Sequence, residues 1–469
     1  MMQRSNVLPL AAVIAACGGS LTSTPDAGDA GIDAAIDATS TPDASAEATV
    51  VDSGLDVADA KVLDAPYVDL DAATSPWAVN FGPGQIWAVA VDSNLDVLAG
   101  GGLAGQTFFL DELDKDGNEL WKKTAYQGVA SSVTFDPSGN VLVSGGTSGT
   151  LDVGGGSIGP GSFIIKFDSN GKFQWQYGPF ANTNFAKVRT RSNGHVLAVG
   201  SFTGTENFGG GSVNAGSYRA VILLELDANK AYVDSKVWKG GDYDAFALAV
   251  DPYDSVFIAG RFAGSIDFGG GSMAGPSIGS SAYNGYVAVL DSKNTYLHQM
   301  ETKTSDNNAY INDLASDWMG NVLVSANAGG SGIDLGGGSL ACGAIIGKLD
   351  GALNHDWSKC FDKSTSYGVA PDPTAGATIA GRYVSGASFG KFSLPNYDGF
   401  FATQFDATGK LLASFGSGSG SGLYEFALGV AYLTWPDVVV GGFCFGPITL
   451  PSGTLTCGSN DAFVARLQP

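Results

Sequence analysis

The chain has 469 residues, with 46 acidic against 24 basic side chains and a formal net charge of -22 at pH 7. Such a charge repels phosphate backbones and anionic headgroups, which argues against nucleic acid as a partner and against electrostatic adhesion to a membrane. Cationic partners and metal ions remain compatible with it. The 68 glycines and the many β-branched and aromatic residues favour short strands joined by tight turns, with few helices.

Residues 1–16 are typical of an export signal. Arg4 precedes an apolar stretch, residues 7–16, that is too short to span a bilayer as a mature helix. The segment ends Ile-Ala-Ala before Cys17, which resembles the bacterial lipobox, whose cysteine becomes the acylated first residue of the mature protein. The resemblance implies export and a lipid anchor, such as palmitate, on Cys17. Gly18 lacks the aspartate associated with inner-membrane retention, so the outer membrane and the cell surface are the implied location. An ordinary secretory signal with a chance cysteine is the alternative.

Residues 17–76 form a low-complexity segment of Ala, Asp, Thr, Ser and Pro after the cysteine. Lys61 is its single basic residue, so self-repulsion and poor hydrophobicity predict an extended, disordered linker between the anchor and the folded part.

From Trp77 onward one unit recurs seven times. Its clearest copy begins at Ala245 and holds four β-like runs separated by turn residues, here named strands A to D. The turn between strands A and B aligns in the seven copies at Asp92, Asp136, Arg191, Asp251, Asp317, Asp372 and Tyr432. Seven such units over residues 77–469 predict an all-β, seven-bladed β-propeller of four-stranded antiparallel blades.

The seventh copy ends with a strand C, DAFVARL from Asp461, and no strand D follows. At the other end, WAVNFGP from Trp77 resembles the strand D ending WQYGP from Trp175. We therefore expect the N-terminal strand to complete the last blade and close the ring. Trp121, Trp175 and Trp357 share one strand D position, which indicates packing between blades.

These motifs together resemble the bacterial β-propeller repeat of cell-surface lipoproteins. The resemblance rests on the DxxGN-like turn, the V-x-V-x-G-x-F strand, the D-A-F-V-A-x-L strand and a GGGS motif present in four copies. It covers residues 77–469 and implies the fold, while carrying over no ligand and no catalytic residue. The GGGS motif lacks the GK[ST] ending of a phosphate loop, so a structural turn is favoured.

Four cysteines fall within the repeats. Cys342 opens a strand C and Cys360 ends the following strand D, whereas Cys444 ends a strand B and Cys457 precedes the next strand C. Export permits oxidation and no CxxC spacing occurs, so we predict the disulfides Cys342–Cys360 and Cys444–Cys457 rather than metal ligation.

Candidate ligand-binding residues lie where strand D leads into the next strand A, and we expect them to ring the mouth of the central channel. The candidates are Tyr126, Asn184, Tyr243, Asp244, Tyr310, Tyr367 and Tyr424. Tyrosines there could stack on sugars or peptide side chains. A repeated packing position explains the recurrence equally, and we favour it.

The three histidines, His195, His298 and His355, fall in different repeats without zinc or triad spacing, so we expect no catalytic constellation, no metal site and no cofactor. The favoured function is a surface-anchored binding or interaction module, monomeric, with an unknown protein, peptide or glycan as partner. The alternatives are an envelope scaffold, or a carbohydrate-active hydrolase or lyase that uses loop carboxylates.

Overall fold

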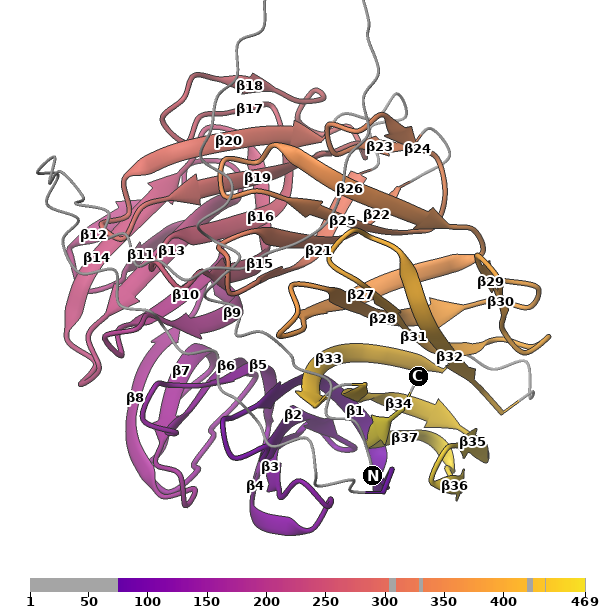
Figure 1. Ribbon diagram of the computed structural model, residues 1–469. Coiled ribbons are helices and arrows are strands. Elements are labelled where there is room, and N and C mark those ends of the chain that lie inside the picture. The colour runs from indigo at the N-terminus through magenta and orange to yellow at the C-terminus, as the bar shows by residue number, and fades with distance from the viewer. Residues whose placement is uncertain (1–74, 303–308, 329–331, 420–424, 435, 469) are drawn as a thin grey trace, which may run out of the picture. The chain divides into compact units, whose positions relative to one another are not determined.

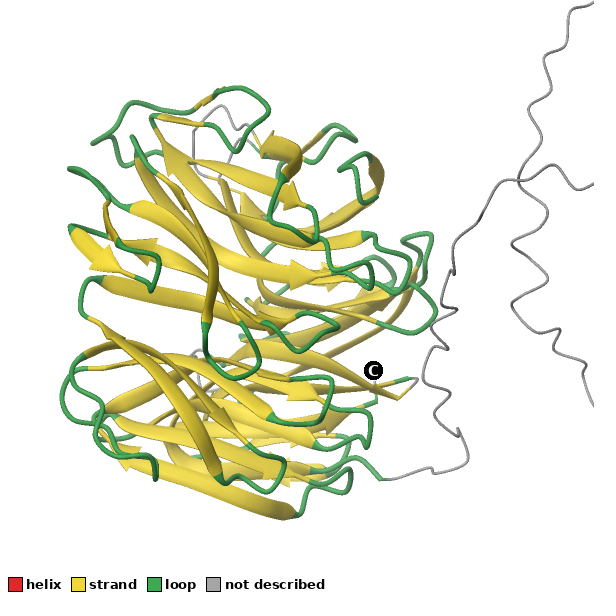
Figure 2. Cartoon of the chain, turned by 90° about the vertical axis from the view of Figure 1, so that its left-hand side faces the viewer, coloured by secondary structure: helices red, strands yellow, loops and turns green. Residues whose placement is uncertain are grey.

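The structure is a computed structural model that describes residues 75–302, 309–328, 332–419, 425–434 and 436–468. All of them belong to the compact unit Leu63–Pro469. Residues 1–74, with the predicted signal peptide, Cys17 and nearly all of the linker, lie outside the described residues, as does Tyr424. The described ranges contain strands and no α-helix (Figure 2), so they offer no helical segment that could cross a bilayer.

The described residues form seven four-stranded antiparallel blades, as predicted, with strand A innermost in each (Figure 1). Blade 1 comprises β1 (Ala78–Val91), β2 (Val97–Leu103), β3 (Thr107–Leu113) and β4 (Glu119–Tyr126). Blade 2 comprises β5 (Gly128–Phe135), β6 (Val141–Thr147), β7 (Gly161–Phe167) and β8 (Phe173–Phe180). Blade 3 comprises β9 (Thr183–Thr190), β10 (Val196–Phe202), β13 (Ala220–Leu226) and β14 (Tyr232–Trp238). Blades 4 and 5 comprise β15 (Asp242–Val250), β16 (Val256–Ala263), β19 (Asn284–Leu290) and β20 (Tyr296–Thr302); and β21 (Ala309–Ser316), β22 (Val322–Ala328), β25 (Ala344–Leu349) and β26 (His355–Phe361).

Blades 6 and 7 comprise β27 (Ser364–Pro371), β28 (Ala377–Tyr383), β31 (Gly399–Phe405) and β32 (Leu411–Ser417); and β33 (Phe426–Thr434), β34 (Asp437–Phe445), β37 (Ser459–Leu467) and the first half of β1. The B/C connections of blades 3 to 7 contain small hairpins. These are β11 (Thr205–Asn207) with β12 (Ser212–Asn214), β17 (Ser265–Ile266) with β18 (Met273–Ala274), β23 (Ile333–Asp334) with β24 (Ser339–Leu340), β29 (Ser388–Phe389) with β30 (Phe392–Ser393), and β35 (Ile448–Leu450) with β36 (Gly453–Leu455).

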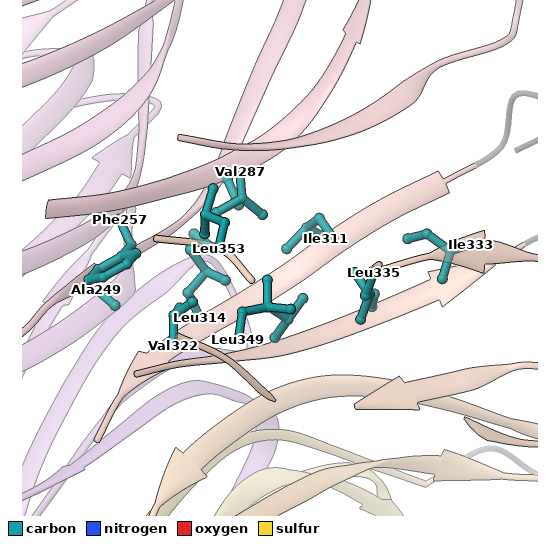
Figure 3. Close-up of a cluster of buried hydrophobic side chains, with 14 of the residues drawn as sticks. Ala249, Phe257, Val287, Ile311, Leu314, Val322, Ile333, Leu335, Leu349 and Leu353 are labelled. Atoms are coloured by element: carbon teal, nitrogen blue, oxygen red, sulfur yellow. The ribbon is translucent and has the colours of Figure 1, made fainter. Parts of the chain in front are cut away.

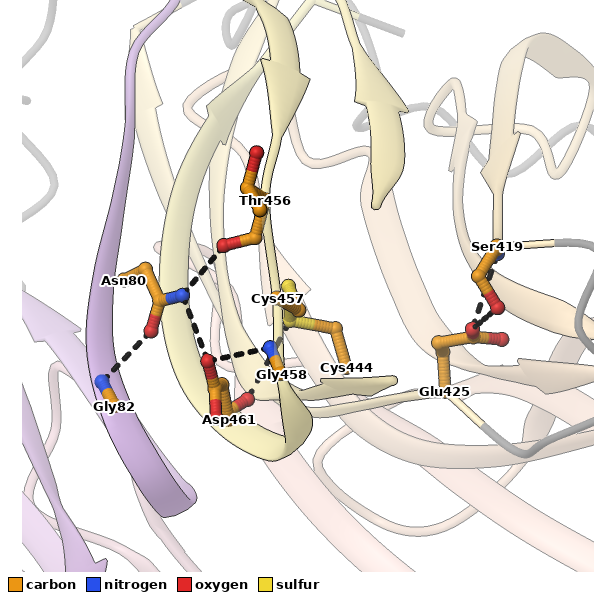
Figure 4. The surroundings of a disulfide bond; sticks show 9 residues. All are labelled: Asn80, Gly82, Ser419, Glu425, Cys444, Thr456, Cys457, Gly458 and Asp461. Atoms are coloured by element: carbon orange, nitrogen blue, oxygen red, sulfur yellow. Dashed lines mark hydrogen bonds between the residues drawn. A yellow bond between two sulfur atoms is a disulfide. The ribbon is translucent and has the colours of Figure 1, made fainter. Parts of the chain in front are cut away.

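The ring closes through β1, which belongs to two blades. Residues 78–83 pair with β37 as the missing strand D of blade 7, and residues 84–91 pair with β2 as strand A of blade 1. In Figure 1 the indigo β1 lies beside the yellow β37. Asn80 fixes the register, because its Nδ2 donates to Asp461 Oδ2 at 2.9 Å and to Thr456 O at 2.7 Å (Figure 4). The predicted N-terminal closure is confirmed.

Both predicted disulfides are present. The Cα atoms are 5.9 Å apart in Cys342–Cys360 and 6.0 Å apart in Cys444–Cys457, within the range that a disulfide spans. Cys444–Cys457 lies next to the closure, where Gly458 N also donates to Asp461 Oδ2 (Figure 4). This bond therefore ties the last B/C connection to the strand on which the ring closes.

Each strand A has a β-bulge at the same place, as its pairing with strand B shows. The residues skipped by this pairing are Trp87, Ser131, Ala186, Phe246, Asn312, Tyr367 and Leu428. In six blades a strand B glycine lies opposite, and a Cβ on Gly260, for example, would come within 1.9 Å of Asp244 O. The glycine of the V-x-V-x-G motif thus makes room for the bulge, whereas β22 carries Ala326 there.

The core consists of layers between neighbouring blades. Strands B and C are covered on both faces, which explains their nearly continuous apolar runs. Figure 3 shows one layer, in which Phe257 and Val287 of blade 4 meet Leu314, Val322 and other residues of blade 5.

Tryptophans at the strand D position join four of the blades to the blade that follows, in agreement with the packing role predicted for them. Four indole N–H groups donate to carbonyls in the following blade's C/D turn: Trp77 to Lys115 (2.9 Å), Trp121 to Ser169 (3.3 Å), Trp175 to Ala228 (3.2 Å) and Trp357 to Ala407 (2.9 Å). A turn glycine lies against three of these rings; a Cβ on Gly171, for example, would come within 2.5 Å of Trp121.

The GGGS segments are structural turns at the tips of the B/C hairpins. A ring from the start of strand D covers the middle glycine, so that a Cβ on Gly210 would lie 2.3 Å from the Tyr232 hydroxyl. The preceding Phe208 is buried, and its carbonyl accepts a hydrogen bond from Tyr177 of blade 2 at 2.8 Å. These hairpins therefore pack between blades, in agreement with the structural turn predicted for the GGGS segments.

Candidate functional site

The two ends of the ring differ. The D/A and B/C connections leave it at one end, here called the loop face, and the A/B and C/D turns leave it at the other, here called the turn face. The predicted binding residues that the structure describes lie at the loop-face end of strand A or just before it. They do not form one ring, however, because they lie at different distances from the bulges of their strands. Tyr243 lies three residues before the skipped residue and Tyr310 two residues before it, whereas Tyr367 is itself the skipped residue.

Tyr243 and Asp244 are part of the packed structure. The Tyr243 side chain is fully buried and its hydroxyl donates to Ser265 O, which leaves it no surface for stacking on a ligand. Asp244 is also buried, and its two carboxylate oxygens bind Arg219 at 2.7 Å and Arg261 at 2.8 Å. Packing, the interpretation favoured from the sequence, accounts for both residues.

Arg261 lies within a cluster of aromatic rings. Its guanidinium carbon is 4.3 Å from the ring centre of Tyr283, 5.2 Å from that of Tyr310 and 5.3 Å from that of Phe246. Cation–π contacts of this kind hold both partners in place. Tyr310 is therefore fixed by Arg261, which is itself fixed by Asp244.

A second such group lies two blades further on. The Arg382 guanidinium carbon is 5.5 Å from the ring centre of Phe426, and Tyr367 packs on the same ring at 5.7 Å. Arg382 also pairs with Asp398 at 3.5 Å. Burial raises the pKa of Tyr367, while the nearby Arg382 opposes that rise, so the phenol is neutral at physiological pH.

Tyr126 and Asn184, in contrast, flank a cavity of the loop face. Tyr126 is 66% exposed and directly precedes Gln127, and the exposed Asn184 directly follows Thr183. The cavity has a volume of about 420 Å³ and is here called the loop-face groove. Its polar side chains come from blades 1 to 3 and are uncharged: Gln106, Gln127, Thr147, Ser148, Ser162 and Thr183.

Hydrogen bonds hold the walls of the loop-face groove. Ser148 Oγ donates to Gln106 Oε1 at 2.9 Å, and Gln127 Oε1 accepts from Thr150 N at 3.1 Å. The amide nitrogens of the two glutamines stay available to a ligand, as no described residue accepts from them. Thr183 Oγ1 is buried without a hydrogen-bond partner in the described part of the chain. The groove thus offers donors and a hydroxyl to an uncharged polar ligand.

The turn-face half of the central channel is a second cavity, of about 360 Å³, lined by strand A of every blade. Lys187 and Asp313 pair across this region at 2.8 Å, which leaves Arg189 without an ion pair among the described residues. Burial lowers the pKa of Arg189, and the nearby Asp313 opposes that effect. Arg189 is the one charged residue among the described residues that line this cavity.

Sequence reasoning missed several residues that shape these surfaces. Trp87, the skipped residue of β1, is 49% exposed, and Gln106 and Thr183 line the groove. An alignment anchored on the strand B glycine would have revealed the bulge positions. The described residues contain no group of three or more His, Cys, Asp or Glu side chains placed to hold a metal ion.

No family model matches the chain, and no curated protein does. Among solved structures, YCF48 bound to D1 peptide has 10% identity and a TM-score of 0.44, over 85% of this chain and 96% of that one. The C-terminal WD40 domain of Sif2 has 8% identity and a TM-score of 0.43, over 84% and 98%. The WD40 domain of Toxoplasma gondii coronin has 8% identity and a TM-score of 0.42, over 84% and 87%. Likeness at this level bears on neither ligand nor activity, and the propeller fold itself rests on the strand pairing described above.

Proposed function

We propose that this protein is a non-enzymatic binding module that holds a segment of a partner protein in the loop-face groove. The observation that carries the proposal is the composition of the groove, an uncharged polar cavity flanked by the exposed Tyr126. A peptide backbone presents one N–H and one C=O per residue, which hydroxyl and amide side chains can match without charge.

The exposed tyrosine supplies the remaining element of a protein-binding surface. An aromatic ring with two side-chain torsions gives a large contact area at a small entropic cost, and tyrosine is enriched in interfaces for this reason. The groove is large enough for a few residues of a partner, since its volume falls within the range of specific ligand pockets.

The proposal includes a lipid anchor on Cys17, which rests on the lipobox resemblance of residues 14–17 and on the acidic linker that follows. The linker would hold the propeller away from the membrane, with the loop-face groove accessible to other envelope or extracellular proteins. Metabolic labelling with an alkyne-bearing fatty acid should mark the native chain and not the Cys17→Ser variant.

The groove is tested by selecting binders to the full-length protein from a random peptide display library and measuring their affinity by titration calorimetry. Tyr126→Ala and Thr183→Val should each weaken the selected peptides at least tenfold. Tyr253→Ala is the matched control, because this tyrosine is 70% exposed on the turn face. Peptides that bind both groove variants normally would overturn the proposal, and so would groove-dependent binding of glycans on an array without any enriched peptide.

A further inference from the structure

One strand C position faces the A/B turn in each blade and carries a charge in most of them. In blade 2, Lys166 Nζ binds Asp136 Oδ2 at 2.8 Å and donates to Ala228 O at 3.3 Å. In blade 5, Lys348 Nζ binds Asp317 Oδ2 at 2.9 Å. These ammonium groups are buried, and each is neutralised by the aspartate of its own turn.

Blade 1 has Glu112 at this position. The cross-strand neighbours establish the equivalence: Leu98–Glu112–Trp121 in blade 1, Leu142–Lys166–Trp175 in blade 2 and Leu323–Lys348–Trp357 in blade 5. The turn of blade 1 also keeps Asp92, which aligns with Asp136, and adds Asp96. Blade 1 therefore has carboxylates where blades 2 and 5 have an ion pair.

These carboxylates line a cavity of about 630 Å³ between blades 1 and 2, here called the blade 1 pocket. Its lining residues are Asp92, Asn94, Asp96, Glu112, Leu120, Trp121, Ser138, Gly139, Ser169 and Asn170. No lysine or arginine is among these described residues. Glu112 is 4% exposed, and its Oε2 has no hydrogen-bond partner within the described ranges.

The carboxylates of the blade 1 pocket lie together without a lysine or arginine in its lining, and their pKa values are raised. Burial, and then the charges of Asp96 and Asp92, raise the pKa of Glu112 to about 7. Burial, with Asp92 and Asp114, raises the pKa of Asp96 to about 6. A cation in the pocket would favour the ionised carboxylates, so its binding would release protons near neutral pH.

We propose that the blade 1 pocket binds an alkylammonium group, such as a lysine side chain of a partner, in the place that Lys166 takes in blade 2. Two acceptors correspond by position. Asp92 aligns with the neutralising Asp136, and Ser169 O, which accepts a hydrogen bond from the Trp121 indole, corresponds to Ala228 O, which accepts hydrogen bonds from both Trp175 and Lys166. Glu112 adds a second carboxylate to this site. Leu120, 50% exposed, and Trp121 provide an apolar wall for the methylene chain.

The test is calorimetric titration of the full-length protein with Nα-acetyl-lysine amide, with Nα,Nε-diacetyl-lysine amide as the uncharged control. We expect binding of the first compound only, with proton release at pH 7 in buffers of different ionisation enthalpy, and at least tenfold weaker binding at pH 5. A free diamine, cadaverine, added as competitor distinguishes small amines from lysine side chains. Tighter binding of cadaverine would assign the pocket to free amines.

Two substitutions of Glu112 complete the test. Glu112→Gln should weaken the binding at least tenfold, and Glu112→Lys should abolish it while raising thermal stability, because its own ammonium fills the pocket. Glu119→Gln, on the exposed side of the same blade, is the control and should bind normally. Equal binding of the diacetylated compound, normal binding by Glu112→Gln, or occupation by Ca²⁺ without any amine binding would overturn the proposal.

Discussion

Blades 1 and 2 are neighbours with the same strand order and the same bulge, yet they treat one buried position in opposite ways. Blade 2 encloses a complete ion pair, Lys166 with Asp136, whereas in blade 1 Glu112 has no ion-pair partner among the described residues and lies next to two more carboxylates. Blade 3 reverses the signs, with Arg191 in the turn and Glu225 on strand C, 3.3 Å apart. The backbone of the repeat thus sets the position, while its charge is free to vary between blades.

The contrast between blades 1 and 2 indicates that the unpaired carboxylate of Glu112 is a local property of blade 1. In a repeat architecture each unit contacts mainly its neighbours, so the cost of an incomplete position stays within one or two blades. Six other blades and the closure through β1 maintain the ring while blade 1 carries the unfavourable group. This is the situation in which a binding function can be placed on a stable scaffold.

The largest expected effect comes from breaking the pair in blade 2. Lys166→Met leaves Asp136 buried and uncompensated, which should lower the free energy of unfolding by about 3–5 kcal/mol in urea titrations. Adding Asp136→Asn should restore most of the loss, because the amide oxygen can still accept from Ser138 N and Asn140 N. If the single variant is as stable as the native chain, the pair contributes nothing and the contrast between the blades is lost.

The second prediction is a pH dependence of opposite sign in the two blades. The pKa of Glu112 is raised to about 7, so the folded state binds more protons than the unfolded state between about pH 4.5 and 7, and stability falls as the pH rises through this window. Glu112→Gln should therefore raise the free energy of unfolding at pH 8 by about 1–2 kcal/mol, with little change at pH 4.5.

Asp136 provides the comparison for that measurement. Burial alone would raise its pKa, but the bonds from Lys166, Asn140 and the turn amides lower it below the usual value. Its contribution is present above about pH 4 and is lost as the pH falls further. Urea unfolding at pH 4.5, 6.5 and 8 follows the titration of Glu112, and a further measurement at pH 3 follows that of Asp136. A Glu112→Gln gain that is equal at pH 4.5, 6.5 and 8 would contradict the assigned titration.

The sequence predicted the fold because several independent patterns agree. Strands B and C are apolar runs between turn residues, and the strand C left without a partner at Asp461 pointed to the segment after Trp77. The disulfides followed from cysteines placed at strand ends. Each of these features depends on local pattern and on chain order, which a sequence displays directly.

The binding residues were harder to predict because register decides them. Tyr243 and Tyr310 occupy similar places in the sequence, but they lie at different distances from the bulge, so one is buried and the other contacts Arg261. The groove depends on three blades meeting, which no single repeat reveals. The aligned strand C segments show Glu112 where blades 2 and 5 have a lysine. Its role as a candidate binding residue became clear only from the structure, in which the side chain is buried and Oε2 has no hydrogen-bond partner among the described residues.

The smallest predicted effect concerns the tryptophans that join the blades. Trp175 and Lys166 donate to the same carbonyl, Ala228 O, whereas Trp121 shares its acceptor, Ser169 O, with no charged group of the described chain. Trp175→Phe should cost about 1 kcal/mol, the typical value of one hydrogen bond, and Trp121→Phe about 0.5 kcal/mol, because water in the blade 1 pocket can replace the lost donor.

A double-mutant cycle measures this difference between the blades. Trp175→Phe combined with Lys166→Met should deviate from additivity by about 0.5 kcal/mol or more, because the two donors share one acceptor. Trp121→Phe combined with Glu112→Gln should be additive when no amine is present. Adding Nα-acetyl-lysine amide introduces an ammonium at Ser169 O, so coupling should then appear in blade 1 between Trp121 and the ligand. Coupling that is absent with the amine would mean that the ligand does not take the place of the lysine of blade 2.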